Sequence, residues 1–221
     1  MSSASHGSPA PSPAVSLTER RKAATRTEIA RAAGELFVRQ GLRATRAEDI
    51  AQAAGVAPRT FYRYFATKEE AVAPLYAAGA HLWADVVAAA PAELSVAEAL
   101  AHGVRRTLTP DAGIPAASWT WARPLIRLAT SEPALRRVWA EVCHSSEHRL
   151  SQVLANRTNL PNLRFTSAVA SAAVRTAVET WAAGEGPVEE VVELALRNLE
   201  AVGGFLGAAG AAAGADGAER V

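Results

Sequence analysis

The fold is decided by residues 41–71, which read GLRATRAEDIAQAAGVAPRTFYRYFATKEEA. Thr45 is the expected start of a short helix, with Glu48 three residues later as its capping-box partner. Gly55 is expected to end that helix, and Pro58 stands where a second short helix would make its first turn. Two short helices joined by a glycine turn predict a helix-turn-helix, whose second helix usually enters the major groove of DNA.

The flanking segments carry the same helical periodicity. Before the motif, the spacing of Ile29, Ala33, Leu36 and Phe37 predicts a helix over 17–40. Strand-like alternation is almost absent, so the sequence predicts an all-α fold of about nine helices, three of them in the helix-turn-helix domain. The six helices expected after the motif cover about 67–89, 96–108, 118–130, 134–157, 167–183 and 188–206.

Composition then divides the chain. Residues 1–16 are mostly Ser, Pro and Ala and predict a disordered arm, because they offer too little apolar surface to offset the entropy of ordering. Residues 17–66 form the expected helix-turn-helix domain, and 67–206 form a larger helical domain. The Gly- and Ala-rich residues 207–221 predict a flexible tail.

The charge distribution points to a polyanion as partner. Residues 18–68 hold eleven basic and five acidic side chains, a net charge of +6, whereas the rest of the chain carries −5. A basic segment joined to an acidic remainder is typical of a protein whose first part binds nucleic acid.

Other classes of protein fit the sequence poorly. The single cysteine, Cys143, excludes an internal disulfide and a four-cysteine zinc site within one chain. No uncharged apolar window of about 18 residues is evident, which argues against a membrane span. We expect a soluble, cytoplasmic protein with no cofactor and no membrane partner.

The second helix of the motif supplies the expected DNA contacts. Pro58, Arg59 and Thr60 are placed to face base edges, and Arg59 has the fork geometry that pairs with guanine. The expected phosphate contacts come from this helix and from the starts of its two neighbours. They are Tyr62, Arg63, Tyr64, Thr45, Arg46 and Lys68.

The segment IARAAGELF at 29–37, followed by Gly41, Thr45 and IAQAAGVAPRTFYRYFATKEE at 50–70, resembles the N-terminal domain of the TetR family of transcriptional regulators. The resemblance covers roughly residues 20–75. It implies an all-helical homodimer that is not an enzyme and whose three-helix head binds a palindromic operator. It also implies that the C-terminal domain binds a small molecule and dimerises through its last two long helices.

Four of the five tryptophans fall in the middle third of the chain. They pack a core in the simpler interpretation; in the functional one they line an apolar cavity with a few polar groups. An apolar ligand, with an anionic group met by an arginine, would fit such a cavity. The candidate lining residues are Trp83, His102, Trp119, Trp121, Arg123, Arg127, Trp139 and His148.

The last two helices carry stripes of small and apolar residues that permit close helix packing. One such stripe can simply seal the core of a monomer, but two long terminal helices favour a two-fold dimer interface. The candidate interface residues are Ala168, Ala172, Trp181, Val188, Val192, Ala195 and Leu199.

Three alternatives remain open at this point. His144 and His148 lie four residues apart, a spacing that can hold a metal ion, so a metal-responsive regulator is the first. An enzyme with a vestigial helix-turn-helix is the second, although phosphate-binding glycine loops, HExxH and GxSxG are all missing from the sequence. A constitutive DNA-binding dimer without an internal pocket is the third.

Overall fold

The computed structural model describes residues 16–215, without the side chains of residues 116, 117 and 204–215. Apart from Ser16, the expected arm therefore lies outside the described residues. The expected tail begins at 207, but the last helix continues through Ala215, and only residues 216–221 of that tail lie outside. The helical fold expected from the sequence is confirmed, and the described part of the chain contains no strand.

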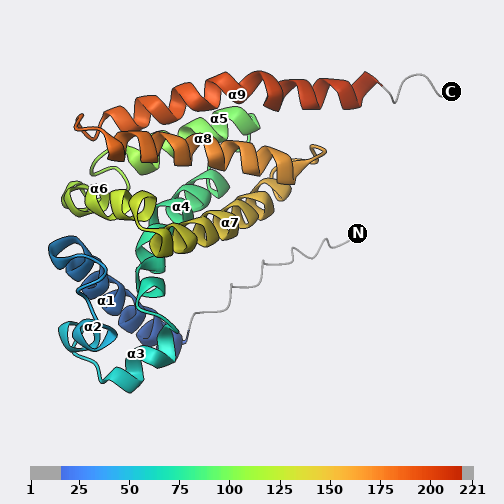
Figure 1. Cartoon of the computed structure of the whole chain (residues 1–221). Coiled ribbons are helices and arrows are strands. Elements are labelled where there is room, and N and C mark those ends of the chain that lie inside the picture. The colour runs from blue at the N-terminus through green and yellow to red at the C-terminus, as the bar shows by residue number, and fades with distance from the viewer. Residues whose placement is uncertain (1–15, 216–221) are drawn as a thin grey trace, which may run out of the picture.

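Three helices form the head of the molecule, at one end of the structure (Figure 1). Their core is closed by fully buried apolar side chains, among them Ile29, Phe37, Ile50 and Phe61. Gly55 adopts a positive φ of +65°, the backbone conformation that the turn requires and that glycine adopts without steric cost. The helices are α1 (Leu17–Gln40), α2 (Ala47–Ala53) and α3 (Pro58–Tyr64).

The start of α2 differs from expectation by one residue. Arg46 precedes the helix, and its backbone N–H donates to the Asp49 carboxylate at 2.9 Å, so the expected pairing of Thr45 with Glu48 is wrong. Thr45 is instead fully buried, and its hydroxyl donates to the carbonyl oxygen of Gly41 at 2.9 Å. Glu48 lies 3.6 Å from the Arg46 guanidinium.

The remaining helices form a body above the head (Figure 1). In it α4 runs through the middle and contacts α5 and α7, while α8 and α9 pack together along one side. The elements are η1 (Glu69–Val72), α4 (Ala73–Ala88), α5 (Val96–Leu108), α6 (Ala116–Ser131), α7 (Pro133–Ala155), α8 (Leu163–Ala183) and α9 (Glu190–Ala215).

The stretch Glu69–Ala88 is long and apolar enough to cross a membrane by length and composition alone, which the sequence analysis did not anticipate. Its apolar character has another explanation in this fold. Tyr76, Trp83 and Val87 are buried between neighbouring helices, and other apolar residues of α4, among them Leu75 and Leu82, line a cavity. The segment is therefore the central helix of the body.

Two arginines of α6 fix the loop between α8 and α9. Arg123 lies over the Trp181 ring, 4.2 Å from its centroid, and donates to the Gly186 carbonyl oxygen. Arg127 donates to the carbonyl oxygens of Ala182 and Gly184. The expectation that these arginines line a ligand cavity is therefore wrong: their guanidinium groups hold main chain that lies far away in the sequence.

Three of the expected dimer residues face the interior of their own subunit. Trp181, Ala195 and Leu199 are buried in the body core, where Trp181 meets Trp119 edge to face at 5.3 Å. A helical stripe shows which residues share a face but not what that face packs against, so this part of the prediction is corrected. Ala168, Ala172, Val188 and Val192 are half-buried in the single chain.

The head joins the body through an unusually close contact. A Cβ atom on Gly34 of α1 would lie 3.0 Å from a δ-carbon of Leu75 on α4 and 3.7 Å from one of Leu125 on α6. Nearby, the Tyr76 hydroxyl donates to the Leu125 carbonyl oxygen at 3.1 Å, which ties α4 to α6. Tyr76, Leu125 and Val142 of the body belong to the same apolar cluster as the head residues, so head and body share one continuous core.

Lys68 closes the head from the other side. Its ammonium group donates to the carbonyl oxygens of Leu42 and Thr45, both at 2.8 Å, and so clamps the loop that leads into α2. Two of its three N–H donors are thus used inside the protein.

Replacing Lys68 with Met should destabilise the protein in the absence of DNA. The two carbonyl groups would lose charged donors, which costs about 1–3 kcal/mol of unfolding free energy. Urea denaturation followed by circular dichroism measures the change. Lys22→Met is the matched control, because exposed Lys22 forms its ion pair with Glu19 on its own helix and makes no other contact of this kind with the described residues. Equal stability of the two variants would contradict a structural role for Lys68.

Candidate DNA-reading surface and ligand cavity

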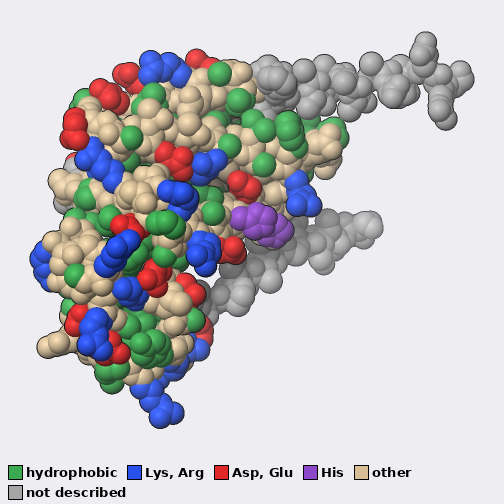
Figure 2. Space-filling model, in the orientation of Figure 1, with side chains coloured by type: hydrophobic (Ala, Val, Ile, Leu, Met, Phe, Trp, Pro, Cys, Tyr) green, Lys and Arg blue, Asp and Glu red, His purple; other side chains and the backbone are tan. Residues whose placement is uncertain are grey.

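The outer face of α3 presents the residues expected to read DNA. Pro58 and Arg59 are exposed, Thr60 is half-buried, and Tyr62 keeps 52% of its surface exposed. Arg63 is exposed and lies over the Tyr64 ring, 5.3 Å from its centroid. Figure 2 shows Lys and Arg side chains at the tip of the molecule where α3 lies.

The inner face of α3 is held rigidly. Phe61 is fully buried, and Phe65, which is 2% exposed, lies 5.9 Å from it between ring centroids. The guanidinium of Arg26 on α1 covers the Phe65 ring at 4.8 Å. Because the apolar face is locked against α1 and α2, the polar residues on the other face project together from a fixed platform.

Two of the expected phosphate contacts change their role. The Thr45 side chain is fully buried and is therefore unavailable to DNA. Lys68 donates two of its N–H groups to main-chain carbonyl oxygens, so its first role is to hold the loop before α2 within the head. Arg46 is exposed at the start of α2, as expected. Its role and those of the α3 residues in DNA binding stay predictions.

A cavity of about 350 Å³ lies in the body between α4, α6, α7, α8 and the loop that connects α5 to α6. This volume is at the lower end of the range for small-molecule sites. The tryptophans that the sequence analysis singled out all line it: Trp83, Trp119, Trp121 and Trp139. His102 and His148, like the two arginines of α6, are not among the lining residues, so their expected place in the cavity is also wrong.

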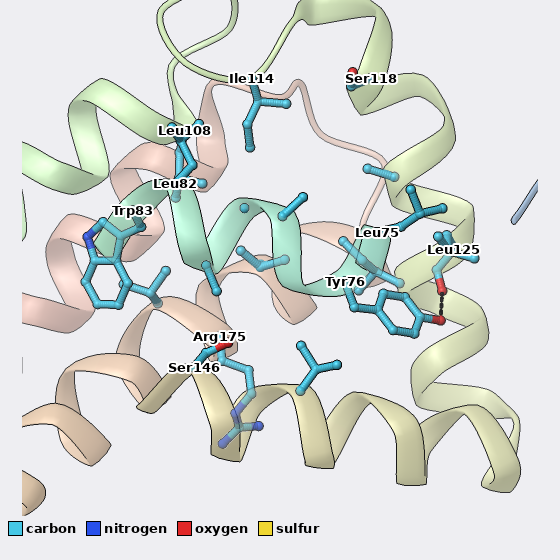
Figure 3. A pocket seen from close by; sticks show the side chains of 18 of the residues that line it. Leu75, Tyr76, Leu82, Trp83, Leu108, Ile114, Ser118, Leu125, Ser146 and Arg175 are labelled. Atoms are coloured by element: carbon cyan, nitrogen blue, oxygen red, sulfur yellow. Dashed lines mark hydrogen bonds between the residues drawn. The ribbon is translucent and has the colours of Figure 1, made fainter. Parts of the chain in front are cut away.

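Figure 3 shows how the cavity meets the joint with the head. Leu75 and Tyr76 of α4 lie opposite Leu125 of α6, and the bond between Tyr76 and Leu125 closes that end. Leu75 and Leu125 are also the residues against which Gly34 packs. At the other side, Ser146 of α7 and Arg175 of α8 contribute polar groups.

An outer cavity adjoins the first and is more polar. It shares Trp139, Cys143, Glu147 and Arg175 with the inner one, so these four residues mark the boundary between the two. Burial raises the pKa of the Cys143 thiol to about 11, which keeps this cysteine protonated and unreactive near neutral pH.

The two histidines on α7 do not gather a metal site. His144 and His148 are exposed, and the His148 ring bonds to Gln152 at 3.0 Å. Among the residues that the structure describes, no group of three or more His, Cys, Asp or Glu side chains is placed to hold an ion. The metal-responsive alternative therefore gains no support.

The sequence analysis missed the charged residues at the cavity boundary, Glu147 and Arg175. Glu147 lies three residues after His144, and Arg175 lies three residues after Ala172. The sequence pattern nevertheless gave no reason to choose these two charges over others on the same helices. The wall shared with the head was missed as well, because only the fold brings Gly34, Leu75 and Leu125 together.

Known proteins match both parts of the chain. The family described as "Bacterial regulatory proteins, tetR family" matches residues 29–73, and the MftR C-terminal domain matches residues 94–204. The HTH-type transcriptional regulator TcmR of Streptomyces glaucescens is 29% identical over 172 residues, which cover 75% of this chain and 76% of that protein.

Solved structures show the same fold at low sequence identity. FadR from Bacillus halodurans, a fatty acid degradation regulator, has a TM-score of 0.53 and 22% identity, and the match covers 79% of this chain and 94% of that one. A TetR-family regulator from Rhodococcus sp. has a TM-score of 0.52 and 18% identity over 81% and 98% of the two chains. With family matches over both its head and its body, this chain belongs to the TetR family of bacterial regulatory proteins.

Proposed function

We propose that this protein is a dimeric transcriptional repressor that a small, largely apolar molecule releases from a palindromic operator. One observation carries the proposal: Leu75 and Leu125 line the cavity and also form the surface on which α1 of the head rests. A molecule that fills the cavity must push against the same side chains that orient the head. Membership of the TetR family supports the DNA-binding role, and the cytoplasm is where such a repressor would act.

In this proposal, α3 enters the major groove and Arg59 reads a base edge. Two-fold pairing of subunits would place the two recognition helices about 34–36 Å apart, or a multiple of it, so that each reads one half of a palindrome. The exposed positions of Arg59 and Tyr62, on a helix whose other face is locked, support this arrangement.

The second subunit is expected to pack on the outer faces of α8 and α9. Phe165, Val169, Ala172 and Thr176 follow each other at steps of three and four along α8, on the side away from the body core, and Phe165 is 54% exposed. A stripe of mostly small residues that begins with an exposed phenylalanine suits close packing of two copies around a two-fold axis.

Release follows from the shared wall. A ligand that displaces Leu75 or Leu125 shifts the surface beneath Gly34 and so reorients α1, which moves the two heads out of register with the operator. By thermodynamic linkage, operator binding must weaken ligand binding by the same factor.

Arg59→Ala should remove sequence discrimination more than general DNA affinity. Loss of a bidentate base contact costs about 1–3 kcal/mol on the preferred duplex and far less on a random one. A duplex selected from a random pool by the unaltered protein serves as the operator, and gel-shift titrations give both affinities. Equal losses on the two duplexes would contradict the assignment of Arg59 as a base reader.

Phe165→Asp should separate the subunits without unfolding them. The new carboxylate lies in the first turn of α8, where the helix dipole favours it, but it would be desolvated between two copies. Sedimentation equilibrium should show a dimer dissociation constant raised at least about tenfold. Leu17→Asp, at an apolar position that is 72% exposed in the head, is the control that should stay dimeric. An unchanged dimer in Phe165→Asp would exclude this face.

Gly34→Ala should weaken operator binding in the absence of any ligand. The new methyl group would press on Leu75 at 3.0 Å and displace α1, while a helix-propensity gain of about 1 kcal/mol offsets part of the strain. We expect an operator affinity about tenfold lower with little change in melting temperature. A second change, Leu75→Val, removes the opposing δ-carbons and should restore binding. Unaltered operator affinity in Gly34→Ala would show that the joint does not set the head's orientation.

A further inference from the structure

The charges at the cavity are not those expected from the sequence. The two arginines considered for an anionic ligand, Arg123 and Arg127, are bound to the loop between α8 and α9. The one arginine that lines the inner cavity, Arg175, is paired with Glu179 on its own helix, with N–O distances of 3.3 Å to both carboxylate oxygens. No arginine at the inner cavity is therefore left without a carboxylate.

A carboxylate, by contrast, is left unmatched. Glu147 lines both cavities and makes no hydrogen bond or ion pair with any residue that the structure describes. The other arginine near it, Arg136, lines only the outer cavity, and its guanidinium donates to the Thr130 carbonyl oxygen at 2.6 Å. Glu179 is fully engaged, because it also accepts from the Trp139 indole N–H at 2.6 Å. The thiol of Cys143 reports the same imbalance: Glu147 and Glu179 both add to the rise in its pKa that burial causes, and only Arg175 opposes them.

The walls around this carboxylate suit a positive charge. Four tryptophans and Tyr76 line the inner cavity, and the faces of aromatic rings attract organic cations. Ser146, next to Glu147 on α7, is only 8% exposed, and its hydroxyl oxygen has no hydrogen-bond partner in the described part of the chain. Figure 3 shows Ser146 projecting from α7 on the side that faces α4. An N–H group of a ligand would give that oxygen a donor.

We propose that the cavity takes an organic cation, an ammonium group attached to an apolar ring body, with the charge held against Glu147. This inference rests on the proposed function, since it names the charge of the molecule that fills the same cavity. The ring body occupies the aromatic end between α4 and α6, and the ammonium group lies at the boundary with the outer cavity. A neutral ligand of the same shape would leave Glu147 unmatched, and an anion would be repelled by it.

Three pyrene derivatives of nearly the same shape test the charge: pyrenylmethylammonium, pyrenylmethanol and pyrenecarboxylate. Energy transfer from the cavity tryptophans to pyrene reports binding directly. The cation should bind at least about tenfold more tightly than the alcohol, and the carboxylate most weakly. In Glu147→Gln the advantage of the cation should disappear, while the affinity for the alcohol should not change. Glu141→Gln is the matched control: an exposed carboxylate on the same helix that lines neither cavity.

The outcomes separate this inference from the proposed function. If the alcohol binds as tightly as the cation, or if Glu147→Gln weakens both equally, the charge assignment is overturned. If the alcohol then still lowers operator affinity in a gel shift, the proposal of a ligand-released repressor holds and only the charge assignment fails. If none of the three probes binds, both the cavity as a ligand site and the cation preference are refuted. Melting temperatures of the two variants establish that each is folded.

Discussion

The architecture depends on how closely α1 lies against the body. At Gly34 there is no side chain, and a Cβ atom there would lie only 3.0 Å from a δ-carbon of Leu75 and in ordinary contact, at 3.7 Å, with one of Leu125. Packed interiors transmit displacement because they contain little free volume. The same two leucines face the cavity on their other side. A glycine in the middle of a helix costs stability relative to alanine, and here it permits the close contact between the head and the body.

In the proposed mechanism, the hydrogen bonds in the rest of the body direct the effect of a ligand toward that contact. On one side, Arg123 and Arg127 bind α6 to the loop that follows α8, so the back wall of the cavity is tied to the helices expected to form the dimer. On the other side, the Tyr76 hydroxyl binds α4 to α6. Lys68 and η1 directly precede α4 in the chain, and Lys68 holds the loop that leads into α2. Because these bonds hold the wall formed by α6, the proposed mechanism assigns the displacement caused by a ligand to α4 and the head.

Local signals in the sequence were sufficient for the helices and for the reading surface. Gly41 and Gly55 end helices through positive φ angles, and Pro58 begins α3, so short-range chemistry alone placed the helix-turn-helix. What the sequence did not reveal were the partners of its polar groups. From the sequence alone, Arg127 is a reasonable ligand-binding cation, but in the fold its guanidinium donates to the Gly184 carbonyl oxygen. The stripe through Ala195 likewise suits a dimer interface, but in the fold it packs into the core of its own subunit. Nothing in the sequence marked Glu147 as a residue of the ligand cavity; only the fold placed it there.

Amide hydrogen exchange tests the central claim most directly, because it reports on the head while the perturbation is confined to the body. Pyrenylmethanol is added until energy transfer shows the cavity to be filled, and exchange is compared with that of the free protein. Coupling through the shared wall predicts altered protection of the α1 amides around Gly34, together with those of α4 near Leu75. Changes confined to α4, α6, α7 and α8, with α1 exchanging as it does in the free protein, would contradict the account.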